Sequence, residues 1–304
     1  MKRNGIVING RRVVSPISVS TVGGHWGLGL LPLAFHPEMA ASMMLLRMTN
    51  TTEILKSSTL KNHIGNFIFY NPKTWRYVQK VGQYDLLNAY SHTNWGAWLN
   101  FLMAGLVKKL GFDIIPSFAA DYSQESQNVI AENVYAADIA VKNGFNVIEY
   151  VPSCPNRSHC IVDNIAIVAE SIRQIKKKNP KLIISIKKGI QHPTEAAQEW
   201  EKAGMDILHG INAISFNTVF PGIISPLQDV GGGAMSGPEI YSFSLKDNIA
   251  TRKAISTFMI FGGGISKVTQ AEECFDCGAS SVIMCTSLRR DGEEARHTIR
   301  TVNT

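Results

Sequence analysis

One cysteine in this sequence directly follows an apolar run. Residues 145–151 read Phe-Asn-Val-Ile-Glu-Tyr-Val, and residues 153–156 read Ser-Cys-Pro-Asn. Because Pro152 and Pro155 flank it, we expect Cys154 in a loop at the end of a strand rather than in the packed centre of one. A thiol on such a rigid support can act as a nucleophile or as an acid/base group. A structural core thiol is the alternative.

Two lysines lie in similar places at the ends of β-rich runs. Lys56 occurs in Leu-Lys-Ser-Ser-Thr, and Lys187 occurs in Ser-Ile-Lys-Lys. A lysine buried at a strand end needs an anionic partner or a lowered pKa, so it can neutralise an anionic cofactor ring. For either lysine taken alone, an ammonium group that simply reaches water is the simpler interpretation.

Two glycine runs could hold a phosphate group. Gly262-Gly263-Gly264 lies between a strand pattern and a helix that begins near Lys267, and Gly231-Gly232-Gly233 is followed by Ser236-Gly237-Pro238. Backbone N–H groups in such turns, with a helix dipole behind them, bind phosphate. A single run is more often an ordinary tight turn. Two runs, after the sixth and seventh strands of a barrel, favour a phosphate site.

The cysteines do not form a disulfide or metal pattern. Five cysteines are an odd number in a chain of this length, which fits a reducing cytoplasm. Cys274 and Cys277 form a C-x-x-C, but their place at the end of a helical stretch favours packing over redox chemistry. His159 and Cys160 lack a second ligand pair at suitable spacing, so we expect no metal site.

The elements that position these residues follow an alternating pattern. Short β-branched runs alternate with longer helical patterns, as in a parallel sheet with crossover helices. The strands are expected at Val13–Ser20, Thr52–Ser57, Ile114–Phe118, Asn146–Val151, Leu182–Lys187, Gly210–Phe216, Phe258–Phe261 and Ser281–Thr286. The helices are expected at Pro37–Met48, Trp95–Leu110, Ser126–Asn143, Asp163–Lys178, Thr194–Ala203, Pro238–Ile255 and Lys267–Cys277.

Eight strands predict an α/β fold, a single (β/α)8 TIM barrel that spans residues 1–304. The stretch from Lys61 to Asn94 lacks helical periodicity, and we expect it to form a loop excursion over the carboxyl-terminal face. Barrel active sites lie at that face, where strand ends place Lys56, Cys154, Lys187, Asn217, Gly262-Gly263-Gly264 and Thr286.

Composition excludes several classes of protein. The formal charge of +6 and pI near 9.0 could indicate a nucleic-acid partner, but basic residues such as Lys176-Lys177-Lys178 fall on solvated helix ends. The most apolar segment, Trp95 to Leu110, contains two lysines and is too short to span a membrane. No secretory signal is visible. We therefore expect a cytoplasmic protein that binds neither nucleic acid nor membrane.

Together these segments resemble the dihydroorotate dehydrogenase family of FMN-dependent barrels, which includes the FMN domain of dihydropyrimidine dehydrogenases. The resemblance runs roughly from Val13 to Leu288. The segments that carry it are Lys56-Ser57-Ser58-Thr59-Leu60, Gly65-Asn66, Asn88 with Asn94, Glu149, Ser153-Cys154-Pro155-Asn156, Ile186-Lys187, Asn217-Thr218, Ser236-Gly237-Pro238 and Gly263-Gly264-Ile265.

The resemblance implies roles for individual residues. Cys154 corresponds to the base that takes the C5 proton of a dihydropyrimidine while the C6 hydride passes to FMN, as in the soluble class 1 enzymes. Lys56 acts beside it and also contacts the flavin. The other implied FMN-binding residues are Ser57, Ser117, Lys187, Asn217, Gly237, Gly263, Gly264 and Thr286. The implied substrate-binding residues, mostly amides that match a pyrimidine ring, are Asn88, Asn94, Asn156, Asn217 and Thr218.

Departures from the family pattern leave alternatives open. Val151 replaces an asparagine of the pyrimidine site, Arg157-Ser158-His159-Cys160 replaces a glycine-rich loop, and Cys285 replaces a glycine of the phosphate loop. A first alternative is therefore an FMN enzyme for a different cyclic amide or enone. A second is a flavin subunit that passes electrons to an iron–sulfur/FAD partner, because this chain has no four-cysteine cluster of its own. The sequence leaves the oligomeric state open, with a homodimer among the alternatives.

Overall fold

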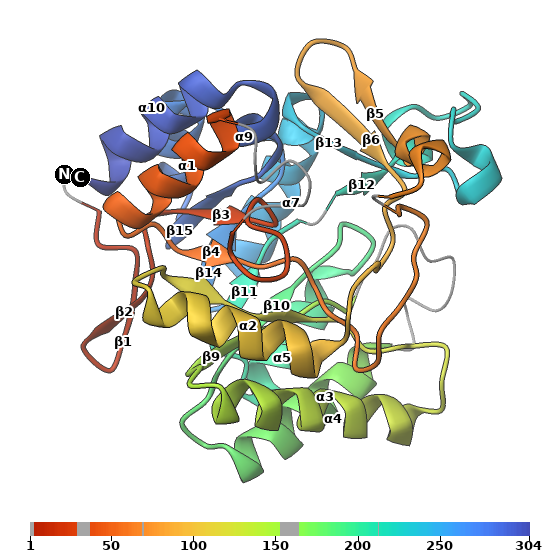
Figure 1. The fold of residues 1–304 in the computed structure, drawn as a ribbon. Helices are drawn as coiled ribbons and strands as arrows, with labels where there is room; N and C mark the ends of the chain where they lie inside the picture. Colours follow the sequence, from red (N-terminus) through yellow and green to blue (C-terminus); the bar gives the residue numbers. More distant parts are fainter. Residues whose placement is uncertain (1–2, 29–36, 69, 153–163, 212) are drawn as a thin grey trace.

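The computed structural model describes residues 3–28, 37–68, 70–152, 164–211 and 213–304 (Figure 1). The loop with Cys154 and Asn156 lies outside these residues. Within them, the main sheet has nine parallel strands in the order β7-β4-β3-β15-β14-β11-β10-β9-β8. Their bounds are β3 Ile17–Ser20, β4 Glu53–Ile54, β7 Ile114–Ile115, β8 Ser117–Phe118, β9 Val147–Tyr150, β10 Ile183–Lys187, β11 Ile207–His209, β14 Phe258–Phe261 and β15 Ser281–Met284.

The two ends of this strand order are one stretch of chain. Pro116 alone separates β7 from β8, and proline has no N–H to contribute to a ladder. β7 pairs with β4, β8 pairs with β9, and the carbonyl of Pro116 accepts the N–H of Glu149 at 2.9 Å. The described strands thus close into an eight-stranded barrel, and the predicted (β/α)8 fold is confirmed.

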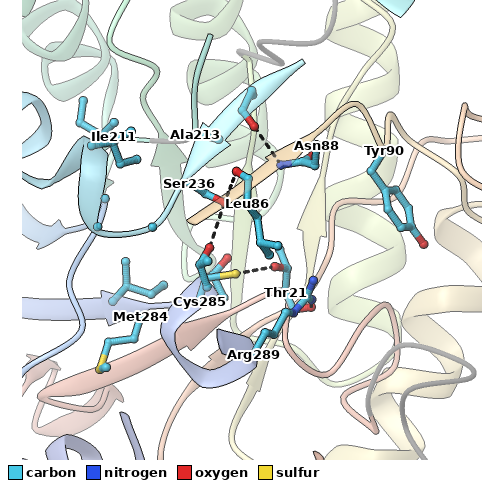
Figure 2. A pocket seen from close by; sticks show the side chains of 18 of the residues that line it. Thr21, Leu86, Asn88, Tyr90, Ile211, Ala213, Ser236, Met284, Cys285 and Arg289 are labelled. Atoms are coloured by element: carbon cyan, nitrogen blue, oxygen red, sulfur yellow. Dashed lines mark hydrogen bonds between the residues drawn. The ribbon is translucent and has the colours of Figure 1, made fainter. Parts of the chain in front are cut away.

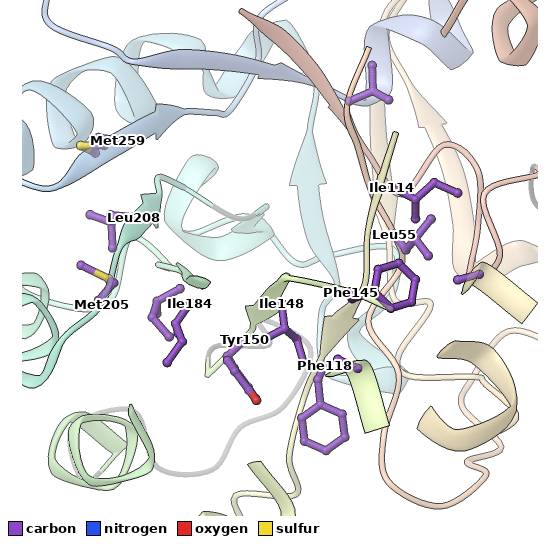
Figure 3. Close-up of a cluster of buried hydrophobic side chains, with 14 of the residues drawn as sticks. Leu55, Ile114, Phe118, Phe145, Ile148, Tyr150, Ile184, Met205, Leu208 and Met259 are labelled. Atoms are coloured by element: carbon purple, nitrogen blue, oxygen red, sulfur yellow. The ribbon is translucent and has the colours of Figure 1, made fainter. Parts of the chain in front are cut away.

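Helices cover the outside of the barrel and bury a large apolar core against it (Figure 3). Leu55, Ile114, Phe118, Ile148 and Ile184 point outward from the strands into this core. The helices are α1 Pro37–Met48, α2 Ala97–Lys109, α3 Ser126–Lys142, α4 Asn164–Lys178, α5 Thr194–Ala203, α7 Tyr241–Ala254, α8 Val268–Asp276 and α10 Gly292–Asn303. Each of the seven predicted helices is present, and α10 was not predicted. The predicted helix 238–255 begins as a 3₁₀ turn, η4 (Pro238–Ile240).

The inside of the barrel is apolar at its amino end. Inward-facing isoleucines and valines from neighbouring strands form one cluster there, and an amino-terminal hairpin, β1 (Ile6–Ile8) with β2 (Arg11–Val14), packs its own side chains against them. The predicted first strand 13–20 is in fact divided at Pro16 into the end of β2 and all of β3. The hairpin therefore closes the amino end of the barrel.

A second, antiparallel sheet covers part of the other end. Its order is β12-β13-β6-β5, with β12 Ile214–Ser215, β13 Ala234–Ser236, β6 Asp85–Asn88 and β5 Val78–Val81 (Figure 1). It has its own apolar core, which includes Leu87, Leu227 and Met235. The excursion predicted over residues 61–94 thus contributes a β-hairpin and a 3₁₀ helix, η2 (Pro72–Tyr77), and the chain after β11 contributes the other two strands.

The sixth barrel strand was predicted in the wrong place. Gly210–Phe216 was expected to form it, but the barrel strand is β11, and residues 214–215 pair instead with β13 in the small sheet. The run from Ile211 to Phe216 carries more apolar side chains than β11, which offers only Ile207 and Leu208 before a histidine. The eighth strand also ends earlier than predicted, at Met284, and Thr286 begins a short helix, α9 (Thr286–Arg290).

No helix of the described residues combines the length and the hydropathy that a transmembrane span requires.

Candidate active site

A cavity opens where the carboxyl ends of the barrel strands face the small sheet (Figure 2). Thr21, Cys285 and Arg289 come from the loops and helix after β3 and β15, while Asn88 and Ser236 come from the small sheet. Because parallel strands all present their carboxyl ends at one rim, residues far apart in sequence meet there. Many of the predicted cofactor-binding, catalytic and substrate-binding residues lie on its wall: Lys56, Ser57, Asn88, Lys187, Gly237, Gly263, Gly264 and Thr286.

Four of the predicted residues that the structure describes do not line the cavity. Asn217 and Thr218 are exposed in a short helix, α6 (Phe216–Val219), and do not line the cavity, because the strand expected to end before them is not a barrel strand. Asn94 is buried beside the cavity, where its side-chain Oδ1 accepts the N–H of Gly96 at 2.7 Å and its Nδ2 donates to Thr59 Oγ1 at 2.8 Å. These hydrogen bonds of Asn94 stabilise the chain just before α2.

Ser117 occupies an intermediate position beneath the cavity. Its hydroxyl lies 2.9 Å from that of Ser57, which lines the wall, and it donates to Glu149 Oε1 at 3.3 Å. The side chain of Ser117 thus links the rim to a buried carboxylate. It supports residues at the cavity rather than forming its surface.

One end of the cavity is built from closely packed backbone. Gly237 has φ +118° and Gly264 has φ +79°, and a Cβ on Gly264 would lie 2.8 Å from the Gly237 carbonyl oxygen and 2.7 Å from the Tyr241 nitrogen. Only glycine fits such backbone without strain. Thr286 Oγ1 donates to Ser236 Oγ at 2.9 Å across this end. By contrast, the other glycine run considered for a phosphate site, Gly231-Gly232-Gly233, does not line the cavity.

Two side chains at this end of the cavity have a buried polar atom without a hydrogen-bond partner among the described residues. The hydroxyl oxygen of Ser287 is buried at the cavity wall and has no hydrogen-bond partner among the described residues. Arg289 donates from Nη2 to the Thr21 carbonyl at 2.7 Å, while its Nε is buried without an acceptor in the described part of the chain. A buried donor without an acceptor is costly. A glycine cradle with a spare hydroxyl and a guanidinium is suited to a phosphate.

Two lysines also line the cavity. Lys56 donates from Nζ to the Ser91 carbonyl at 3.3 Å, and its ammonium lies 4.0 Å from the centre of the Tyr90 ring. Lys187 reaches Ser20 Oγ at 3.5 Å. The two ammonium groups come from β10 and from the segment after β4, on different sides of the barrel. They bring two positive charges to the wall of the cavity.

A buried acid–base pair lies in the barrel below the lysines. Glu149 on β9 accepts at Oε2 from His209 Nδ1 on β11 at 2.5 Å, and both side chains are 1% exposed. Burial alone raises the pKa of Glu149, but the contact with His209, aided by Lys187, brings this pKa below its usual range. Burial and Lys187 lower the pKa of His209. At neutral pH a neutral imidazole therefore donates to a carboxylate.

The comparison with known families agrees with this geometry. The family model of dihydroorotate dehydrogenase matches residues 38–302. The chain belongs to the dihydroorotate dehydrogenase family. No curated protein matches it. Dihydroorotate dehydrogenases are FMN-dependent oxidoreductases, and this membership makes the protein an oxidoreductase of that type.

The cavity fits the cofactor of the dihydroorotate dehydrogenases. FMN has a phosphate at one end and, at the other, a ring that becomes negatively charged on reduction. The glycine cradle with Ser287 matches the first requirement, and Lys56 with Lys187 matches the second. Within the described residues no cluster of His, Cys, Asp and Glu could hold a metal ion.

Two residues at this cavity were not predicted from the sequence. A lone histidine after two apolar residues, such as His209, carries no signal of a partner sixty positions earlier. Its position at the end of a barrel strand would have been the signal, had β11 been placed correctly. Arg289 lies in a run of two arginines that reads as a solvated helix end. Only the contact with the Thr21 carbonyl places it at the cavity.

Proposed function

We propose that this chain binds FMN in the cavity at the carboxyl ends of the barrel strands. Gly237, Gly263 and Gly264 hold the phosphate together with Thr286 and Ser287, and Arg289 adds positive charge beside it. Lys56 and Lys187 lie at the ring. The observation that carries the proposal is that one cavity joins a glycine cradle containing an unpartnered buried hydroxyl to two lysines from separate strands.

The proposed reaction is oxidation of a dihydropyrimidine of the dihydroorotate type at its C5–C6 bond. When bound, FMN accepts the hydride from C6. Cys154 takes the C5 proton, a role supported by the family tetrapeptide Ser153-Cys154-Pro155-Asn156, which lies outside the described residues. Lys56 and Asn88, which line the cavity, and Asn156 orient the ring by hydrogen bonds.

A second candidate substrate is a different cyclic amide or enone. Val151 and Tyr90 both line the cavity. Val151 presents methyl groups where the resemblance leads us to expect an amide, and Tyr90 presents an aromatic ring that stacks on Phe67 with 4.7 Å between ring centres. These side chains favour a less polar ring than orotate. Reversible reduction of an enone would use the same flavin and the same acid/base group.

Spectroscopy of the purified protein tests the cofactor and the substrate separately. The protein should be yellow, or become yellow with added FMN, with the flavin released on denaturation. An isolated chain that takes up no FMN would rule out the proposal. Anaerobic titration with dihydroorotate should bleach the flavin band. Bleaching by other dihydropyrimidines or cyclic enone pairs, but not by dihydroorotate, would favour the second candidate.

The cysteine role has its own test. Cys154→Ser should slow reduction of the flavin by substrate at neutral pH by about 10²-fold or more, because a hydroxyl is a much weaker base than a thiol. FMN should remain bound. The matched control is Cys277→Ser, at the end of α8, which should leave reduction unchanged. Stopped-flow absorbance measures both rates. Equal rates for Cys154→Ser and the unsubstituted protein would remove Cys154 from the mechanism.

A further inference from the structure

Glu149 and His209 form a polar layer inside the barrel, with 1% of each side chain exposed. The next layer toward the amino end of the barrel consists of isoleucine and valine side chains, which pack without polar atoms. The polar layer therefore has no evident packing role. A buried carboxylate that is hydrogen-bonded to a histidine is often no more stabilising than apolar residues of the same size, so its presence next to a cavity calls for a functional explanation.

The hydrogen bonds fix which atom of the histidine is available. Glu149 occupies Nδ1 of His209, while its other oxygen accepts from Ser117. A neutral ring that donates at Nδ1 keeps its lone pair on Nε2. His209 is also one of the residues that line the cavity. Nε2 is thus the atom at which this ring can gain a proton, and Glu149 holds the ring in the orientation that keeps it available.

Two charged groups act on the ring, one from the adjacent strand β10 and one from β9 beyond it. Glu149 faces it from β9 and Lys187, its register partner, from β10. On its other side β14 presents the apolar Ile260 in register. Among the described residues the pair Glu149 and Lys187 therefore sums to zero charge around a neutral imidazole. One added negative charge in the cavity would leave the group unbalanced in a medium of low dielectric constant.

We propose that His209, oriented by Glu149, takes up a proton at Nε2 when the flavin in the cavity is reduced. This inference rests on the proposed function. The substrate gives two electrons and one hydrogen as hydride, and Cys154 releases the C5 proton to solvent, so the cavity is left with one negative charge on the reduced flavin. The proton that goes to Nε2 comes from solvent and balances that charge. His209 breaks no bond of the substrate, and it returns the proton when the electrons leave.

The pH dependence of the flavin midpoint potential measures this proton. Its slope is proportional to the number of protons taken up per electron pair. His209→Asn keeps an N–H at the position of Nδ1, so it retains the bond to Glu149, but it cannot be protonated. We expect its slope between pH 6 and 8 to be about half of that in the unsubstituted protein. Glu149→Gln should also lower the slope, because it removes the carboxylate that orients His209. Spectroelectrochemical titration of the FMN-loaded protein gives these values.

Controls separate this inference from the proposed function. His297→Asn, at an exposed position on α10, should leave the slope unchanged. An unchanged slope in FMN-loaded His209→Asn would overturn the inference alone, whereas failure of the unsubstituted protein to bind FMN would overturn both. Should the variant not fold, ¹⁵N NMR of the unsubstituted protein decides. The His209 signals should move to imidazolium values on reduction, and signals that stay at neutral values would refute the proposal.

Discussion

At the scale of single residues, Glu53 is a buried carboxyl group whose pKa is strongly raised. It lies fully buried on β4, where one carboxylate oxygen accepts the N–H of Gly23 and the other has no partner among the described residues. Burial raises its pKa to about 8, against the opposing effects of that hydrogen bond and of Arg289. A buried carboxyl without a close cation is most stable when it is protonated.

Protonation of Glu53 therefore makes stability depend on pH. Its pKa rises from 4.5 unfolded to about 8 folded, so its contribution is greatest below pH 4.5 and is lost as pH rises toward 8. Between these two pH values the free energy of unfolding should fall by about 1.4 kcal/mol per pH unit. Glu53→Gln should remove this dependence and gain stability relative to the unsubstituted protein at pH 8.

Urea unfolding at pH 5, 6, 7 and 8 measures the effect as a difference between two proteins, which cancels the other titrating groups. Glu293→Gln, an exposed substitution on α10, is the matched control and should follow the unsubstituted protein at every pH. Parallel stability curves for Glu53→Gln and the unsubstituted protein would contradict a raised pKa at this carboxyl.

At the scale of elements, the ends of strands decide the chemistry. β10 and β11 end at Lys187 and His209, which are partners in register, and β9 carries Glu149 one position before its end. Side chains alternate along a strand, so every second residue points inward and the inward set forms layers across the barrel. An apolar layer at one end and a polar layer at the other follow from this alternation.

The turn after β14 can be tested through its glycines. Gly264→Ala places a Cβ against backbone atoms of Gly237 and Tyr241 at positive φ, so we expect FMN affinity to fall by about tenfold or more and stability by about 1–3 kcal/mol. Gly231→Ala is the matched control, because it also has positive φ but no atom within 4 Å of the added Cβ.

The Gly231→Ala control should lose about 1 kcal/mol of stability and no FMN affinity, because its Cβ strains the local backbone but contacts no other atom. Quenching of flavin fluorescence gives the affinity, and urea unfolding gives the stability. Equal losses of FMN affinity in the two variants would mean that close approach of the backbone at Gly264 plays no part in cofactor binding.

At the scale of the whole molecule, residues of both the barrel and the small sheet line the cavity. The barrel supplies lysines and glycines, and the small sheet supplies Asn88, Ala234 and Ser236. The small sheet is held by its own apolar core and by the exposed ion pair of Arg76 with Asp229, which contributes little by itself. Integrity of the cavity therefore depends on apolar packing beneath the hairpin β5–β6.

Leu87→Ala tests that dependence. Leu87 is fully buried in the core of the small sheet, so its truncation should cost about 2–5 kcal/mol and weaken FMN binding. Leu106→Ala, half-exposed on α2, is the control and should change neither quantity appreciably. Urea unfolding followed by far-ultraviolet circular dichroism and by tryptophan fluorescence measures stability. Unchanged FMN affinity in a destabilised Leu87→Ala would show that the small sheet is dispensable for the cofactor.

The sequence by itself determined the barrel, because alternation of β-branched runs with amphipathic helices is a local pattern that only a parallel sheet with crossovers satisfies. It also placed Lys56, Lys187, Gly264 and Thr286 at one rim, because strand ends share a rim once the fold is known. Seven of the eight strands were placed within a few residues by the same local signals.

Only the tertiary structure decided which residues meet across the barrel. β11 is short and is paired on both sides, so contacts with β10 and β14 rather than its own hydrophobicity define it, and its misplacement had put Asn217 at the cavity. The pairing of Glu149 with His209 and the contact of Arg289 with the Thr21 carbonyl join positions far apart in the chain. Such contacts depend on barrel closure, which leaves no periodic trace in the sequence.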